Sequence, residues 1–261
     1  MYNEIVERFI KAQESAGAAY RSVASFERET LAGIAQHAHA VDVRSDYSTH
    51  RELESFCISL AGNVVNRARR EFAPAGTRLD IDDATEREHA GLNIGEALDA
   101  GRVPDIDGLW ASLHARYGGN GGKELAYQQA GQRIIKGFSL NRRKDVQRTA
   151  SAVVLRLRAT SEGCYGRSTR KLGYYSCQHA ADCLQGLMAF AAKAGHQALA
   201  IGLGRLNVHT LEYSYREKRS FPGLDIVFFK DAWDFKFSHQ IAEELMLFIG
   251  EYGAVFMEDQ S

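Results

Sequence analysis

Residues 224–252, LDIVFFKDAWDFKFSHQIAEELMLFIGEY, carry the clearest structural pattern in this chain. Two runs rich in branched and aromatic residues, 224–229 and 234–238, flank a short turn, which is typical of a β-hairpin. Ser238 then precedes apolar residues at helical spacing, so we predict that it caps a helix. Hairpin strands pair antiparallel, and a following helix covers one face of such a sheet. The segment therefore predicts an α+β C-terminal domain.

The chain between the middle and this hairpin has a mixed pattern. Residues 152–159, AVVLRLRA, alternate in polarity and predict a half-buried strand with Arg156 and Arg158 on its polar side. Because both arginines leave the strand on the same side, we expect them to point to solvent. The other elements predicted here are a helix at 123–138, a loop at 160–175, a helix capped by Ser176 and ending at Ala194, and strands at 198–203 and 206–216.

The N-terminal half predicts long antiparallel helices. Apolar residues within 4–36 recur at alternating spacings of four and three, a near-heptad pattern typical of a helix that packs along another. We expect 50–72 to be the partner helix, although a second copy of the chain would fit the same pattern as a homodimer. The GGNGG stretch at 118–122 then breaks the pattern. It separates a helical N-terminal region, 1–117, from an α+β domain, 123–261.

Charge is distributed unevenly along the chain. Residues 133–171 contain 11 Lys and Arg against two acidic residues, although the net charge of the whole chain is −1. Residues 80–107 hold nine Asp and Glu against two arginines. A concentrated basic segment suits a polyphosphate partner, whereas a solvated surface or pairing with the acidic stretch would give the same pattern.

If the basic segment binds nucleic acid, its cations meet phosphates, and Tyr165 and Tyr174 can stack on unpaired bases. Phosphate contacts position a partner rather than read its sequence, so we expect low sequence selectivity. The residues that we predict to contact nucleic acid are Arg142, Arg143, Lys144, Arg156, Arg158, Tyr165, Arg167, Arg170 and Lys171.

The terminal hairpin supports an enzymatic alternative. Asp225 in one strand, with Asp234 and Lys236 in the next, resembles the acidic-plus-D-x-K arrangement of PD-(D/E)xK nucleases. Two carboxylates could hold Mg²⁺ there, and the lysine could stabilise charge or help to activate water. The interval from Asp225 to Asp234 is short for that family, and Leu224 stands where the family has proline. An exposed strand face protected by charged residues explains the same three positions.

Four patches together resemble a known bacterial family. They are IVERFIKAQESAGAAY from residue 5, LWASLHARYGG from 109, GQRIIKGFSL from 131, and LDIVFFKDAWDFKFSHQIAEELMLFIGEYG from 224. The chain resembles a large bacterial domain of unknown function found in phage, plasmid and genomic-island genes, sometimes fused to DNA methyltransferases. The resemblance implies a mobile-element context. The chain has neither a glycine-rich cofactor loop after a strand nor a DPPY-type motif, so methyltransferase catalysis is not expected.

The composition of the chain limits its possible location in the cell and its possible functions. The chain has no apolar run long enough for a membrane span, its first residues lack a signal-peptide pattern, and its four cysteines form no CxxC pair. We therefore expect a soluble cytoplasmic protein. The leading hypothesis is a non-enzymatic accessory protein, without cofactor, that contacts nucleic acid or a nucleoprotein complex. The alternatives are the Mg²⁺-dependent nuclease and a protein-interaction inhibitor of a host defence complex.

Overall fold

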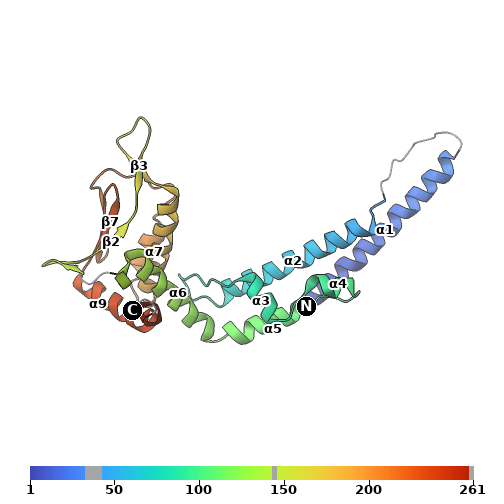
Figure 1. The fold of residues 1–261 in the computed structure, drawn as a ribbon, viewed down its shortest axis with the longest axis horizontal. Helices are drawn as coiled ribbons and strands as arrows, with labels where there is room; N and C mark the ends of the chain where they lie inside the picture. Colours follow the sequence, from blue (N-terminus) through green and yellow to red (C-terminus); the bar gives the residue numbers. More distant parts are fainter. Residues whose placement is uncertain (33–42, 143–145, 259–261) are drawn as a thin grey trace. The chain divides into compact units, whose positions relative to one another are not determined.

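The structure, a computed structural model, describes residues 1–32, 43–142 and 146–258. Within these ranges, helices occur in both halves of the chain and strands only in the second half, so the predicted α+β class is confirmed (Figure 1). The chain divides into two units. Unit 1 comprises Met1–Glu71 and Ile81–Gly118, and unit 2 comprises Phe72–Asp80 and Gly119–Ser261. None of the helices in the described ranges combines the length and apolarity that crossing a membrane requires.

The regular elements that the structure describes in unit 1 are all helices. They are α1 (Tyr2–Leu31), α2 (Asp46–Glu71), α3 (Asp83–His89), α4 (Ile94–Asp99) and α5 (Ile106–Tyr117). The first two run antiparallel, because the ring of Phe9 stacks on that of Phe56 at 4.1 Å while Gln13 donates to Glu52 at 3.1 Å. The predicted partner helix therefore exists, and it begins four residues earlier than expected, at Asp46.

The near-heptad seam of α1 has two parts. Near its start, Phe9 packs on α2, whereas Ile5 is exposed and its neighbour Val6 is buried in its place. Farther along, the side chains of Val23 and Phe26 are exposed. The predicted continuation of this helix through residues 33–36 lies outside the described residues. A homodimer through the seam stays a prediction.

A buried carboxylate joins α3 to α5. Glu86 is 3% exposed and accepts a hydrogen bond from the Tyr117 hydroxyl at 2.6 Å and another from Arg116 at 3.0 Å. Burial, reinforced by the bond to Glu86, raises the pKa of Tyr117 to about 12. A buried charge with satisfied partners fixes the packing of the two helices.

Unit 2 contains a five-stranded antiparallel sheet in the order β1-β2-β7-β6-β5 and a separate β3–β4 hairpin. The strands are β1 (Gln147–Arg148), β2 (Val153–Arg158), β3 (Ser161–Gly163), β4 (Arg170–Leu172), β5 (Lys218–Phe221), β6 (Leu224–Phe228) and β7 (Ala232–Phe237). The helices are α6 (Gly121–Phe138), the short 3-10 turn η1 (Leu140–Arg142), α7 (Tyr174–Lys193), α8 (Gln197–Gly204), α9 (His239–Tyr252) and α10 (Ala254–Glu258). The expected hairpin is β6–β7, and Ser238 caps α9 by accepting from the Ile241 amide at 3.4 Å.

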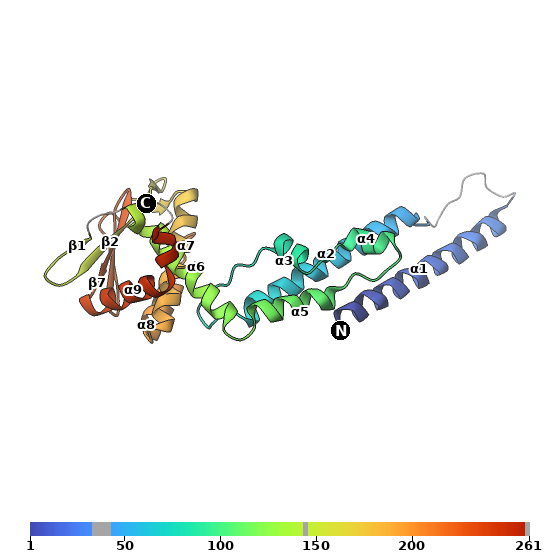
Figure 2. The same cartoon turned by 60° about the horizontal axis from the view of Figure 1, so that its bottom comes forward.

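Alternation along the strands separates two faces of this sheet. The side chains of Trp233, Phe235 and Phe237 are fully buried, and Phe235 meets Phe138 of α6 with ring centroids 5.1 Å apart. Helices α6, α8 and α9 contact the sheet and α7 packs against α6 (Figures 1 and 2). The packing of α6 on α7 is close, since a Cβ at Gly186 would lie 2.7 Å from the Ala130 carbonyl. The polar side chains of the alternating pattern occupy the opposite face.

Three local predictions were wrong. Residues 198–203 form helix α8, because a short apolar run does not distinguish a strand from a buried helix. Within 206–216 the structure has a single β-bridge, from Tyr213 to Arg170, in place of a strand. Helix α7 begins at Tyr174, and Ser176 accepts from the Thr160 amide at 3.0 Å instead of capping it.

The expected loop at 160–175 holds the β3–β4 hairpin, and β5 was not predicted. Both elements consist of three- or four-residue strands, and their hydrogen bonds to partner strands form only in the folded chain. Such short strands leave little periodic signal in a sequence.

Candidate nucleic-acid interface

Six charged side chains share the polar face of the five-stranded sheet, which we call the open sheet face. The pairing register puts Lys218 opposite Val227, Val227 opposite Asp234, and Asp234 opposite Arg156, in one row across four strands. Side chains directly opposite in antiparallel strands point to the same side of the sheet. The charged members of the open sheet face are Arg156, Arg158, Lys218, Asp225, Asp234 and Lys236. Four cations and two carboxylates give this face a formal charge of +2.

Arg156 is held by a carboxylate in the middle of this face. Its Nε lies 2.6 Å from Oδ1 of Asp234 and its Nη2 lies 2.8 Å from Oδ2. The Asp234 side chain is 9% exposed, whereas that of Arg156 is 52% exposed. The hydrogen bonds to Asp234 raise the pKa of Arg156. The predicted outward direction of Arg156 is observed, but its charge is largely balanced by Asp234.

The three residues of the nuclease hypothesis also lie on this face. Asp225 stands directly opposite Lys236, and Asp234 precedes Lys236 by two positions on the same strand. The pKa of Asp225 is lowered, chiefly by a hydrogen bond from Ser220. Lys218, whose Nζ lies 3.3 Å from Oδ2 of Asp225, adds to the effect. Asp225 and Asp234 are the two carboxylates here that could hold Mg²⁺. The described residues contain no group of three or more His, Cys, Asp or Glu arranged to hold a metal.

Several segments converge where β2 ends with Arg158. The Ser161 amide donates to the Lys230 carbonyl at 2.9 Å, which joins the hairpin to the β6–β7 turn. The Gly173 amide donates to the Thr160 carbonyl at 3.1 Å, which brings in the start of α7. The β-bridge between β4 and Tyr213 then adds the loop before β5. One end of the sheet is therefore surrounded by a hairpin, a helix terminus and two turns.

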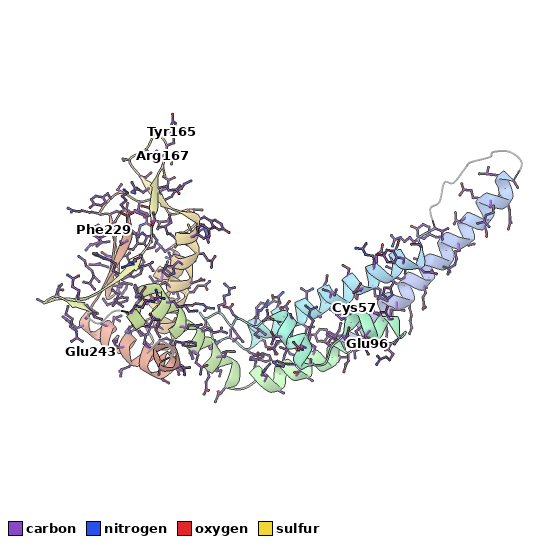
Figure 3. All side chains as sticks on the ribbon, in the orientation of Figure 1. Cys57, Glu96, Tyr165, Arg167, Phe229 and Glu243 are labelled. Carbon is purple, nitrogen blue, oxygen red and sulfur yellow. The ribbon has the colours of Figure 1, made fainter. Side chains whose placement is uncertain are left out.

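The β3–β4 hairpin presents Tyr165 at its tip (Figure 3). The Arg167 amide donates to the Cys164 carbonyl at 3.1 Å, and Gly166 has a φ of +72°, a conformation that glycine adopts without strain. This turn leaves the Tyr165 side chain fully exposed. Arg167 lies beside it at the tip and contacts Glu212 at 3.1 Å.

The two remaining basic residues of this hairpin differ in role. Arg170 donates to the Ser161 hydroxyl at 2.8 Å and to the Ser161 carbonyl at 2.6 Å, so it stabilises the hairpin. Lys171 is exposed and forms no ion pair with any described residue. Lys171 stands opposite the exposed Glu162 in the strand pairing, so it is held less tightly than Arg170 and stays accessible to a partner.

The turn before β5 contributes residues that the sequence analysis missed. Tyr215 is 57% exposed, and the guanidinium of Arg216 lies 5.3 Å from the centre of its ring. Arg216 has a φ of +64°, which is uncommon for a residue other than glycine. Lys230, in the β6–β7 turn, is also exposed. The basic run YREKR at 215–219 is a usable signal in the sequence, although its first two residues belong to the strand predicted at 206–216.

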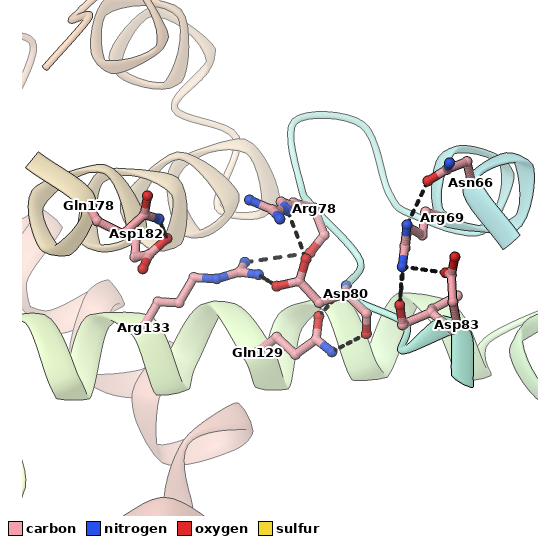
Figure 4. A network of polar contacts seen from close by, with 10 residues as sticks. Asn66, Arg69, Arg78, Asp80, Asp83, Gln129, Arg133, Gln178 and Asp182 are labelled. Carbon is pink, nitrogen blue, oxygen red and sulfur yellow. Dashed lines mark hydrogen bonds and ion pairs between the residues drawn. The ribbon is translucent and has the colours of Figure 1, made fainter. Parts of the chain in front are cut away.

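The other cations of the basic segment lie elsewhere. Arg142 is exposed in η1, whereas Arg143 and Lys144 lie outside the described residues. On α6, Arg133 pairs with the carboxylate of Asp80, whose backbone exchanges two hydrogen bonds of 2.8 Å with the Gln129 amide (Figure 4). Part of the basic segment and the first residue of the acidic stretch thus stabilise unit 2 itself.

Comparison with protein-family models, with curated proteins and with solved structures gave no match to this chain. The resemblance to the mobile-element family thus depends on the four sequence patches alone and stays a prediction.

Proposed function

We propose that this protein contacts nucleic acid, free or within a nucleoprotein complex, through the open sheet face and the adjoining end of the sheet, and that it does so without catalysis. One observation carries the proposal. Arg158, Lys171 and Lys236 are exposed around this surface and form no ion pair with any residue that the structure describes. The carboxylates of Asp225 and Glu212 act on Lys236 and Lys171 from beyond ion-pair distance, so a phosphate backbone can bind these cations directly. Such binding releases the ions condensed on the nucleic acid.

The arrangement suits positioning more than sequence reading. Side chains on a flat sheet can meet successive phosphates, but they do not enter a groove as a recognition helix does. We therefore expect low sequence selectivity. A cytoplasmic location and an accessory role in a mobile element, both expected from the sequence, belong to the same proposal.

A charge-reversal series tests the proposal. Fluorescence anisotropy of labelled oligonucleotides should show that Lys171→Glu weakens binding by about tenfold at low salt, because one phosphate contact becomes repulsive. Lys136→Glu is the matched control, since Lys136 belongs to the same basic segment but is exposed on α6. Equal loss of affinity in both variants would mean that only the net charge matters, and no loss in either would remove the interface from this surface.

The Mg²⁺-dependent nuclease is a second candidate, favoured by one observation: Asp225, Asp234 and Lys236 share the open sheet face. It predicts cleavage of the same oligonucleotides on addition of Mg²⁺ or Mn²⁺, and loss of cleavage in Asp225→Asn. Asp225 is the better residue to change, because removing Asp234 would also break its bidentate pair with Arg156. Products analysed on a gel with and without metal distinguish the two candidates.

The inhibitor hypothesis predicts neither binding nor cleavage. A protein that leaves every oligonucleotide untouched at low salt, yet retains a host protein through washing, would act through protein contacts. That result would overturn the proposed nucleic-acid function.

A further inference from the structure

We infer that the nucleic acid bound here is single-stranded, with unpaired bases stacked on four exposed tyrosines at one end of the sheet. We call these residues the tyrosine end: Tyr165, Tyr174, Tyr175 and Tyr215. The inference deepens the proposed function and depends on it.

The tyrosines of unit 2 form two groups, one packed against the core and one exposed to solvent. Three of its seven, Tyr127, Tyr213 and Tyr252, pack against the core, whereas the four of the tyrosine end are exposed. All four lie on the segments that the hydrogen bonds bring to the same end of the sheet. Isolated exposed aromatic residues are ordinary on protein surfaces. Four exposed rings on segments that meet at one end of a sheet, two of them in contact with each other, indicate a contact surface.

Three of the rings project from ordered backbone, either a hairpin turn or the first turn of a helix. Tyr165 lies at the hairpin turn shaped by Gly166, with its side chain wholly in solvent. Tyr174 and Tyr175, 85% and 87% exposed, occupy the first turn of α7, with ring centroids 5.5 Å apart and planes nearly perpendicular. Tyrosine loses little conformational entropy when it forms a contact, because only two side-chain torsions become fixed.

The neighbouring positive charges favour nucleic acid over an apolar partner. Arg158 ends the strand that leads into the hairpin, Lys171 lies on β4, and Arg216 lies against the ring of Tyr215. Cations beside stacking rings are the combination that single-stranded nucleic acid binds, since phosphates and base faces alternate along the strand. In a duplex the base faces are already stacked on one another, so they cannot reach the tyrosines.

The experiment compares a labelled oligothymidine, a labelled oligouridine and a labelled duplex of the same length by anisotropy. The variants are Tyr165→Ala and Tyr174→Ala, with Tyr165→Phe as the conservative variant that keeps the ring. Tyr47→Ala is the control, since Tyr47 is an exposed tyrosine of unit 1. We expect each alanine variant to weaken single-strand binding about tenfold, because stacking of one base is lost. Duplex binding, Tyr165→Phe and Tyr47→Ala should be unchanged.

The dependence of affinity on salt gives a second readout. Tyrosine carries no charge, so Tyr165→Ala should lower affinity without changing the slope of log K against log salt. Equal binding of strand and duplex, with no effect of either alanine variant, would overturn the single-strand inference and leave the proposed function standing. Absence of all binding by the wild-type protein would remove the proposed function as well. Oligothymidine and oligouridine reveal whether DNA or RNA supplies the strand.

Discussion

Replacing Arg156 by alanine should destabilise unit 2, because the nearly buried Asp234 carboxylate would lose its bidentate partner. Hydrogen bonds to charged groups contribute about 1.5–3 kcal/mol each. The Arg156 side chain is 52% exposed, so water would partly replace its hydrogen bonds to Asp234 in the variant. Two such bonds would contribute at least about 3 kcal/mol, and the exposure lowers the expected loss to about 2 kcal/mol. With a urea m-value of about 2 kcal/mol per M, the unfolding midpoint should fall by about 1 M.

The assay is urea unfolding followed by tryptophan fluorescence in a Trp110→Phe background. The chain has two tryptophans, and Trp233 lies buried in β7, so its emission then reports unit 2 alone. Arg158→Ala is the matched control on the same face of the same strand, and its exposed side chain should cost less than about 0.5 kcal/mol. If the two variants shift the midpoint equally, the account of Asp234 as a residue stabilised by Arg156 is refuted.

Two further predictions concern packing and pH. Gly186→Ala places a Cβ 2.7 Å from the Ala130 carbonyl oxygen, so it should destabilise unit 2 by about 1–3 kcal/mol. In Gly250→Ala the new Cβ has open space around it, so this variant should stabilise unit 2 by about 0.5–1 kcal/mol. Thermal unfolding of the two variants measures both changes. The pKa of Tyr117 is raised to about 12, so its contribution to the stability of unit 1 is complete below the ordinary value near 10 and declines as pH rises from about 10 to about 12. Urea unfolding followed by Trp110 fluorescence at pH 8 and at alkaline pH should show this decline, and Tyr117→Phe should remove it.

The elements that were predictable have strong local patterns. The hairpin of β6 and β7, the cap at Ser238 and the helix after it follow from alternation, a turn and helical spacing within one continuous stretch. The assignment of Arg156 and Arg158 to one side of a strand succeeded for the same reason, since the period of two is local.

What failed depends on contacts between distant residues. No local pattern shows that Asp234 would pair with Arg156, because that contact requires β7 to lie beside β2, 78 positions away along the chain. The tyrosine end was only partly predictable, because the segment that holds Tyr215 is joined to the hairpin by a β-bridge between Tyr213 and Arg170, which no local pattern indicates. The charge count of the basic segment also overstated the free positive charge, since Arg133 pairs with Asp80.

The most direct test of the central claim, that the open sheet face and the end of the sheet bind phosphates, is a salt titration. Affinity for a single-stranded oligonucleotide should fall steeply with salt in the wild-type protein. A variant with Arg158, Lys171 and Lys236 all changed to serine should show a slope of log K against log salt that is shallower by about 2, for three contacts at about 0.7 each. An unchanged slope, or a wild-type protein that does not bind at low salt, would contradict the claim.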